Sequence, residues 1–191
     1  MMTTILKAMQ KKNSGISEDV LHIFEDIVQN HNGPSSPYIG LDERCSVFAK
    51  AMEEHLTKEQ RYRIFEKNGA CNGASADKER KAFSLDYAHL VLNERIALFS
   101  KTFDRWKPVL NDDNTLTLTF KCTHGYYKCA LEGTLTTPPP NVEVYFERCA
   151  GGRLYELQKA LGIKLKIKSV DVSSLYEDVL NPVVFVFEIV E

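Results

Sequence analysis

The sequence lacks any long hydrophobic run. None of its apolar stretches reaches the ~18 residues that a membrane-spanning helix needs, so the sequence predicts no such helix. The first 15 residues also lack an apolar core followed by a small-residue cleavage site, which predicts that no secretory signal is present. A strong charge of either sign is missing as well, because 24 basic and 26 acidic side chains are interleaved and give a net charge of −2. We therefore expect neither a nucleic-acid partner nor a membrane partner.

Paired cysteine motifs are absent too. The five cysteines include no pair with the CxxC spacing of a zinc knuckle, and the chain has no phosphate-loop, dinucleotide-binding or serine-elbow motif. An odd number of cysteines without a secretory signal favours a reducing compartment over a disulfide framework. The sequence thus predicts a cytoplasmic protein whose cysteines are free, bind a metal or react.

What the sequence does have is a helical first half, residues 1–110. Apolar residues recur three and four positions apart in segments 17–34, 41–56 and 86–106, which is the period of an amphipathic helix. Thr57 and Gln60 have the spacing of a capping box, and Gly69 is a natural residue at which to end the helix that follows.

The second half, residues 111–191, changes to the alternating pattern of strands. Segments 115–122, 163–172 and 182–190 alternate or are rich in β-branched residues, which predicts three strands. Residues 126–133 are predicted to pair with the first of these as a hairpin. Residues 142–147 are expected to form a short strand or an extended lead-in to a helix that ends at Gly162. The fold class is therefore α+β, with a helical N-terminal half and an antiparallel sheet with a packed helix in the C-terminal half, as two regions or one continuous domain.

The segment ERCAGGRLYELQKALG, residues 147–162, is the strongest candidate for a functional site. We expect Cys149 to lie in the first turn of its helix, where unpaired backbone N–H groups and the helix dipole favour a thiolate. Arg153 would add a positive charge, and Gly151 and Gly152 would let a ligand approach the backbone. The alternative is structural, with a small buried cysteine and glycines that serve packing at a tight strand-to-helix junction.

The other cysteines suggest a possible metal site. Cys122 and His124 are two residues apart in a predicted strand and would share a face, with Cys129 close behind. Together with Cys71, which lies between glycines, they offer the sulfur and imidazole ligands that zinc or iron takes. The alternative is that these are ordinary residues of a sheet and a turn.

Residues 70–191 resemble the 4-vinyl-reductase-like ligand-binding domains and the bacterial proteins grouped with L-2-amino-thiazoline-4-carboxylic acid hydrolase. The likeness lies in the cysteine and glycines before a helix, the Leu-Gly pair that precedes a strand, an acidic turn and a final Phe-x-Ile. In this chain they are Cys149, Gly151, Gly152, Leu161, Gly162, Glu177, Asp178, Phe187 and Ile189. The resemblance implies an α+β fold around a small-molecule pocket, in a protein that is often a homodimer. The chain lacks the cysteine that the first family carries in its acidic turn.

Three functions follow from these patterns. The first is a small-molecule-binding, sensor-like domain with a pocket beside Cys149, lined by Gly151, Gly152, Arg153 and Tyr126. The second is a hydrolase of a small carboxylate or ring amide, in which Cys149 attacks, His124 relays the proton and the amides of residues 150–152 hold the oxyanion. The third is a structural metal site with zinc or iron, whose candidate ligands are Cys71, Cys122, His124, Cys129 and Cys149.

Overall fold

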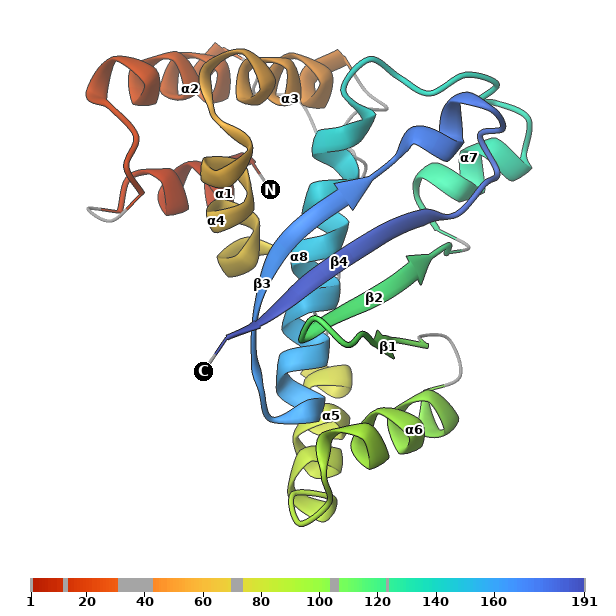
Figure 1. Ribbon diagram of the computed structural model, residues 1–191. Coiled ribbons are helices and arrows are strands. Elements are labelled where there is room, and N and C mark those ends of the chain that lie inside the picture. Colours follow the sequence, from red (N-terminus) through yellow and green to blue (C-terminus); the bar gives the residue numbers. More distant parts are fainter. Residues whose placement is uncertain are drawn as a thin grey trace.

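The computed structural model describes residues 2–11, 14–30, 43–69, 74–103, 107–122 and 124–190 (Figure 1). In this part of the chain eight α-helices, one 3₁₀ helix and four strands are found. The helices are α1 (Met2–Met9), α2 (Glu18–Asn30), α3 (Glu43–His55), α4 (Lys58–Asn68), α5 (Ala74–Asp86), α6 (Leu92–Thr102), α7 (Tyr126–Leu131), α8 (Val142–Leu161) and the 3₁₀ helix η1 (Ser173–Tyr176). The strands are β1 (Val109–Leu110), β2 (Thr115–Phe120), β3 (Lys164–Asp171) and β4 (Val183–Val190). The predicted α+β fold class is confirmed. None of the helices within the described ranges is both long enough and apolar enough to cross a membrane.

The sheet is antiparallel, with the strand order β1-β2-β4-β3. Alternate side chains of β2 and β4, such as Leu118 and its partner Phe185, are fully buried on one face. This is the face against which α8 packs, as Figure 1 shows. Strand β3 is one of the two edge strands, and there the Glu66 carboxylate accepts a hydrogen bond from the Ile167 N–H at 2.8 Å. That bond satisfies a backbone group at an edge that could otherwise pair with another chain.

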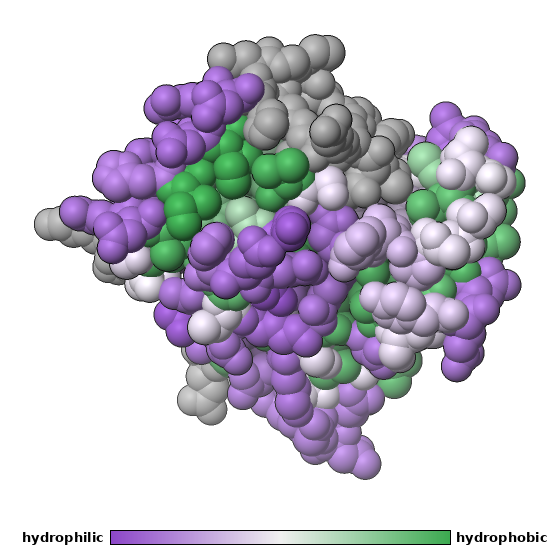
Figure 2. Space-filling model, turned by 90° about the horizontal axis from the view of Figure 1, so that it is seen from above, coloured by the Kyte–Doolittle hydropathy of each residue, from purple (hydrophilic) through white to green (hydrophobic). Residues whose placement is uncertain are grey.

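Helix α8 is the centre of the molecule. Its apolar residues at intervals of three and four face the sheet, while α4 and α5 pack on its other sides (Figure 1). A second apolar cluster lies among α1, α2, α3 and α4, and Val144 of α8 belongs to it. On the face seen from above, over α2 and α3, hydrophobic residues gather in a patch between hydrophilic ones (Figure 2). Helices of the first half therefore complete the core around α8.

Helices α4 and α8 cross with their backbones in contact. A Cβ atom at Gly151 would lie 2.2 Å from the carbonyl oxygen of Phe65, and one at Gly69 would lie 2.1 Å from the backbone of Gly151 and Gly152. Only glycine fits at either position, because real Cβ atoms do not approach backbone atoms so closely. Gly69 ends α4 as predicted, but with a φ of −60° rather than a left-handed one. The glycine is needed there for space and not for its φ.

Local signals at helix ends were predicted well. The capping box of Thr57 and Gln60 is present in both directions. Gly162 ends α8 in the left-handed region, with a φ of 64°.

Two predicted strands are wrong. Residues 126–133 contain helix α7, and residues 142–147 form the first turns of α8, which is 20 residues long. When read alone, the segment from Val142 to Glu147 resembles a strand, because two β-branched valines flank Glu143 and two aromatic residues follow them. The segment becomes helical because Phe146, Ala150 and Leu154 continue a helical stripe that buries against the sheet.

Candidate functional site

Cys149 lies in the middle of α8, so the prediction that it begins a helix is wrong. The N–H groups of residues 150–152 are in the helix interior, where each pairs with the carbonyl four residues earlier. They are not available to stabilise a thiolate or an oxyanion. The electrostatic argument for an activated Cys149 nucleophile therefore does not apply to this structure.

The glycines next to Cys149 have a structural use. Gly151 meets the backbone of α4, and both Gly151 and Gly152 are buried. The sequence left open whether these glycines let a ligand approach the backbone or serve packing. The structure agrees with the packing interpretation.

One face of α8 nevertheless carries a row of polar side chains. Tyr145, Cys149, Arg153 and Glu156 follow one another at intervals of four, four and three residues, which places them on the same side of the helix. Arg153 is thus a neighbour of Cys149, as expected, although the reason is helical spacing. Tyr145 and Glu156 were not among the predicted site residues. The spacing would have identified them had the helix been predicted from residue 142.

At one end of this row, phenol and thiol groups form a cluster, which we call the phenol–thiol cluster: Cys122, Tyr126, Tyr127, Tyr145 and Cys149. The Tyr145 hydroxyl accepts a hydrogen bond from the Tyr126 N–H at 3.1 Å and forms another with the Cys149 side chain. Burial raises the pKa of Tyr145 far above its usual range, and the nearby Cys149 thiol adds to that increase. Burial raises the pKa of Tyr127 as well, and the thiols of Cys122 and Cys149 add to that increase. Cys122, Cys129 and Cys149 are all partly exposed, and none of the three forms a disulfide.

Adjacent tyrosines in the cluster differ in their hydrogen bonding. The Tyr127 hydroxyl lies 2.7 Å from the Asn181 carbonyl oxygen and 3.2 Å from that of Phe120, so it has acceptors on both sides. The Tyr126 hydroxyl has no hydrogen-bond partner within the described residues, although the side chain is only 1% exposed. Leaving such a group unpaired costs about 1–3 kcal/mol. Burial raises the pKa of Tyr126 to about 12, with further contributions from the Asp178 carboxylate and from Tyr176 once its phenol ionises, so the Tyr126 phenol stays protonated and can donate.

The predicted metal ligands are not assembled in the described part of the chain. Cys71 lies outside the described residues. The Cys122 thiol donates to the carbonyl oxygen of His124 at 3.3 Å, while the His124 side chain is exposed, and Cys129 is carried by α7. No three His, Cys, Asp or Glu side chains there are arranged so that they could hold a metal ion.

Two buried ionic clusters surround α8, and the sequence did not reveal either. In the first, Arg61 of α4 binds the fully buried Glu147 through two hydrogen bonds of 2.8 Å. Burial raises the pKa of Glu147, and the Arg61 guanidinium opposes that increase. Glu147 is thus a structural partner of Arg61. The 86 residues that separate the two explain why no local pattern shows the pair.

The second cluster lies at the other end of the polar row of α8. Arg153 Nη1 donates to Glu156 Oε2 at 3.0 Å, and Arg80 of α5 approaches the same oxygen at 3.9 Å. Beside it, Lys159 and Tyr155 of α8 both donate to the Asp77 carboxylate of α5. These contacts fasten α5 to α8.

Comparison of the chain with protein-family models, curated proteins and solved structures finds no match in any of the three. The resemblance to the 4-vinyl-reductase-like domains therefore stays a prediction, and the functional argument depends on the geometry alone.

Proposed function

We propose that this protein is a small-molecule-binding domain whose ligand contacts the phenol–thiol cluster. The observation that supports the proposal is the Tyr126 hydroxyl, a buried hydrogen-bond donor for which the described residues supply no acceptor. A ligand oxygen or nitrogen would supply the acceptor and remove the cost of leaving this group unpaired.

The surroundings of Tyr126 indicate the kind of ligand. The rings of Tyr127 and Phe146 lie 5.3 and 5.1 Å from that of Tyr126, so the site is aromatic. Since the pKa of Tyr126 is about 12, its hydroxyl is a neutral donor. An uncharged aromatic molecule with a carbonyl or a ring nitrogen matches both features. The partly exposed thiols of Cys122 and Cys149 give the site contact with solvent and would stay reduced in the cytoplasm, where we expect the protein to act.

A disulfide-exchange screen tests this proposal. The protein is incubated with aromatic fragments that carry a short disulfide linker, under partly reducing conditions, so that the Cys149 thiolate displaces a thiol and retains only fragments that also bind nearby. We expect Cys149 to select fragments with a hydrogen-bond acceptor over their hydrocarbon counterparts. Tyr126→Phe should abolish that preference, because it removes the donor and little else.

Cys129 is the internal control, because it is also a partly exposed thiol and lies outside the polar row of α8. It should be modified by all fragments alike. Equal modification of Cys149 by all fragments, or the same preference in Tyr126→Phe, would contradict the proposal.

A further inference from the structure

Arg80 is the most unusual charged side chain in the described part of the chain. It is carried by the middle of α5 and is only 7% exposed. Among the described residues, its buried Nε and Nη1 atoms have no hydrogen-bond partner, and its Nη2 atom lies 3.9 Å from the Glu156 carboxylate oxygen Oε2. A buried guanidinium normally has its donors satisfied, because an uncompensated buried charge costs several kcal/mol.

From this geometry we infer that Arg80 is the anchor of a second binding site, which takes the carboxylate of a small monoanionic ligand where α5, the end of α6 and α8 meet. The site is separate from the phenol–thiol cluster, and the inference does not depend on the function proposed above.

The charges at this junction favour a single negative charge. Among the buried side chains, the guanidinium groups of Arg80 and Arg153 flank one carboxylate, Glu156, so these three sum to a charge of +1. Glu79 also acts on Arg80, but its carboxylate is exposed and its charge is screened by water. Glu156 is engaged by Arg153 at 3.0 Å, which leaves only the longer contact for Arg80. A monoanion would neutralise the cluster, whereas a dianion such as phosphate would leave an excess negative charge beside Glu156 in a buried setting.

The apolar walls of the junction favour a ligand with a ring. The Arg80 guanidinium carbon lies 3.5 Å from the centre of the Phe103 ring and 5.7 Å from that of Phe99. Phe83 packs against both of these phenylalanines. A carboxylate bound to Arg80 would place the rest of an aromatic ligand among these rings.

Phe103 provides a means of access. Its ring covers the guanidinium and is partly exposed at the end of α6, whereas Phe99 is fully buried. Rotation of one partly exposed ring would open a path to the unpaired donors, and side-chain rotations of this kind are fast.

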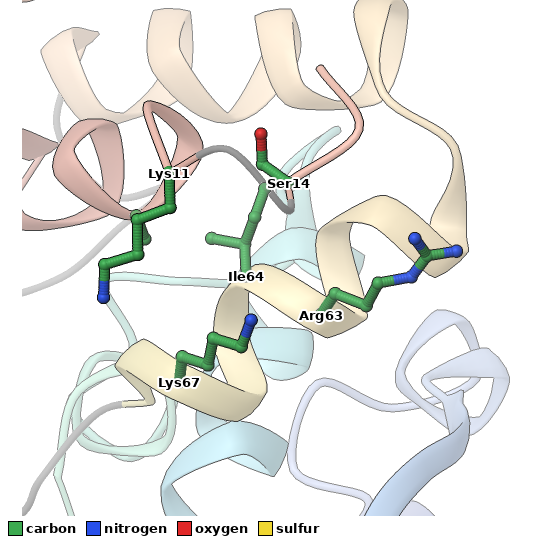
Figure 3. Close-up of a pocket in the computed structure, with 6 residues that line it drawn as sticks. Lys11, Ser14, Arg63, Ile64 and Lys67 are labelled. Atoms are coloured by element: carbon green, nitrogen blue, oxygen red, sulfur yellow. The ribbon is translucent and has the colours of Figure 1, made fainter.

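The exposed cations between α1 and α4 differ from Arg80 in their solvation. Lys11, Arg63 and Lys67 surround a shallow hollow between α1 and α4, which Figure 3 shows with Ser14 at its rim. These cations are solvated at the surface, and any anion they attract would bind weakly and without preference for a ring. Arg63 is therefore the matched control for Arg80.

The test is a fluorine NMR titration with 4-fluorobenzoate and, as an uncharged analogue of the same shape, 4-fluorobenzamide. We expect saturable binding of the benzoate and none of the benzamide. Arg80→Met should raise the dissociation constant at least about tenfold, and Arg63→Gln should leave it unchanged. Glu156→Gln should tighten binding, since it removes the competing carboxylate.

Arg80→Lys keeps the charge but not the planar fork, so it should also weaken binding if the guanidinium itself is recognised. Circular dichroism checks that each variant is folded, and Glu156→Gln and Arg80→Lys keep the test decisive if Arg80→Met does not fold. The inference is overturned if the benzoate does not bind or if the benzamide binds equally well. It is also overturned if inorganic phosphate displaces the benzoate more readily than acetate does. A third contradiction would be that Arg63→Gln weakens binding while the Arg80 variants do not.

Discussion

The contact between α4 and α8 gives a sharp prediction about two glycines. Gly69→Ala would place a methyl group 2.1 Å from the backbone of α8, and Gly151→Ala would place one 2.2 Å from the Phe65 carbonyl oxygen. Relief of either clash to 3.0 Å, below which Cβ contacts essentially never occur, requires the two helices to move apart by 0.8–0.9 Å (3.0 − 2.2 and 3.0 − 2.1). Both clashes are with backbone, so no side-chain rotation can relieve them.

The expected cost follows from this geometry. Overpacking of a well-packed core typically costs 1–3 kcal/mol, and a clash between two backbones should reach about 3 kcal/mol. Gly151 lies within α8, where the higher helix propensity of alanine offsets about 1 kcal/mol of the cost of Gly151→Ala. Gly69 lies just after α4 and has no such compensation, so Gly69→Ala should be the more destabilising change. With about 2–4 °C of melting temperature per kcal/mol in a chain of this size, Gly69→Ala should melt roughly 6–12 °C lower.

Urea unfolding followed by circular dichroism at 222 nm measures these changes. Gly133→Ala is the matched control, because a Cβ atom at Gly133 would meet no neighbouring atom within 4 Å. The φ of Gly133 is +71°, so the substitution still strains the backbone. The variant should lose only the ~1 kcal/mol of a left-handed backbone. If Gly69→Ala is no less stable than Gly133→Ala, the close crossing of α4 and α8 is wrong.

Three further changes test the buried polar groups. Arg61→Met leaves Glu147 buried without its partner and should lower the free energy of unfolding by about 3–5 kcal/mol in urea melts; a loss below 1 kcal/mol would contradict a fully buried pair. The pKa of Tyr126 is raised from 10 to about 12, so the unfolded state loses this proton first as the pH rises. The contribution of Tyr126 to the free energy of unfolding is therefore fully present below pH 10 and is lost between pH 10 and 12. Over that range the free energy of unfolding should fall by up to about 2.7 kcal/mol more in the wild-type protein than in Tyr126→Phe. Parallel pH profiles of the two proteins would refute this. Glu66→Leu removes the acceptor for the Ile167 N–H and should cost about 1–2 kcal/mol, while Glu66→Gln should cost less.

The sequence predicted those elements whose signal is local. Strands β2 and β3 alternate along most of their length, β4 is rich in β-branched residues, and the capping box at Thr57 needs only four residues to be recognised. Helix α8 was predicted too short, because Val142 and Val144 and the aromatic residues after them have a high strand propensity when read alone. Their helical period becomes clear only with the apolar residues that follow them.

The chemistry predicted for the candidate site followed from placing the start of α8 near Cys149 instead of at Val142. The site was therefore only partly predicted. Cys149 and Arg153 were identified as neighbours, but the supposed helix start gave the wrong chemistry for both. Tyr126 was among the predicted ligand-binding residues, while its unpaired hydroxyl is a property of the packed structure. Arg80 lies more than 70 residues from Arg153 and Glu156 in the sequence, so no spacing rule could place them together.

The stability of two neighbouring tyrosine variants tests the central claim most directly. Tyr127→Phe removes a hydroxyl that has carbonyl acceptors at 2.7 and 3.2 Å, and should lower the free energy of unfolding by about 1–2 kcal/mol. Tyr126→Phe removes a buried hydroxyl that has no acceptor among the described residues, and should leave the ligand-free protein equally stable or up to about 1 kcal/mol more stable. If Tyr126→Phe is destabilised as much as Tyr127→Phe, the Tyr126 hydroxyl stabilises the folded protein itself, and the proposed role in ligand binding is contradicted.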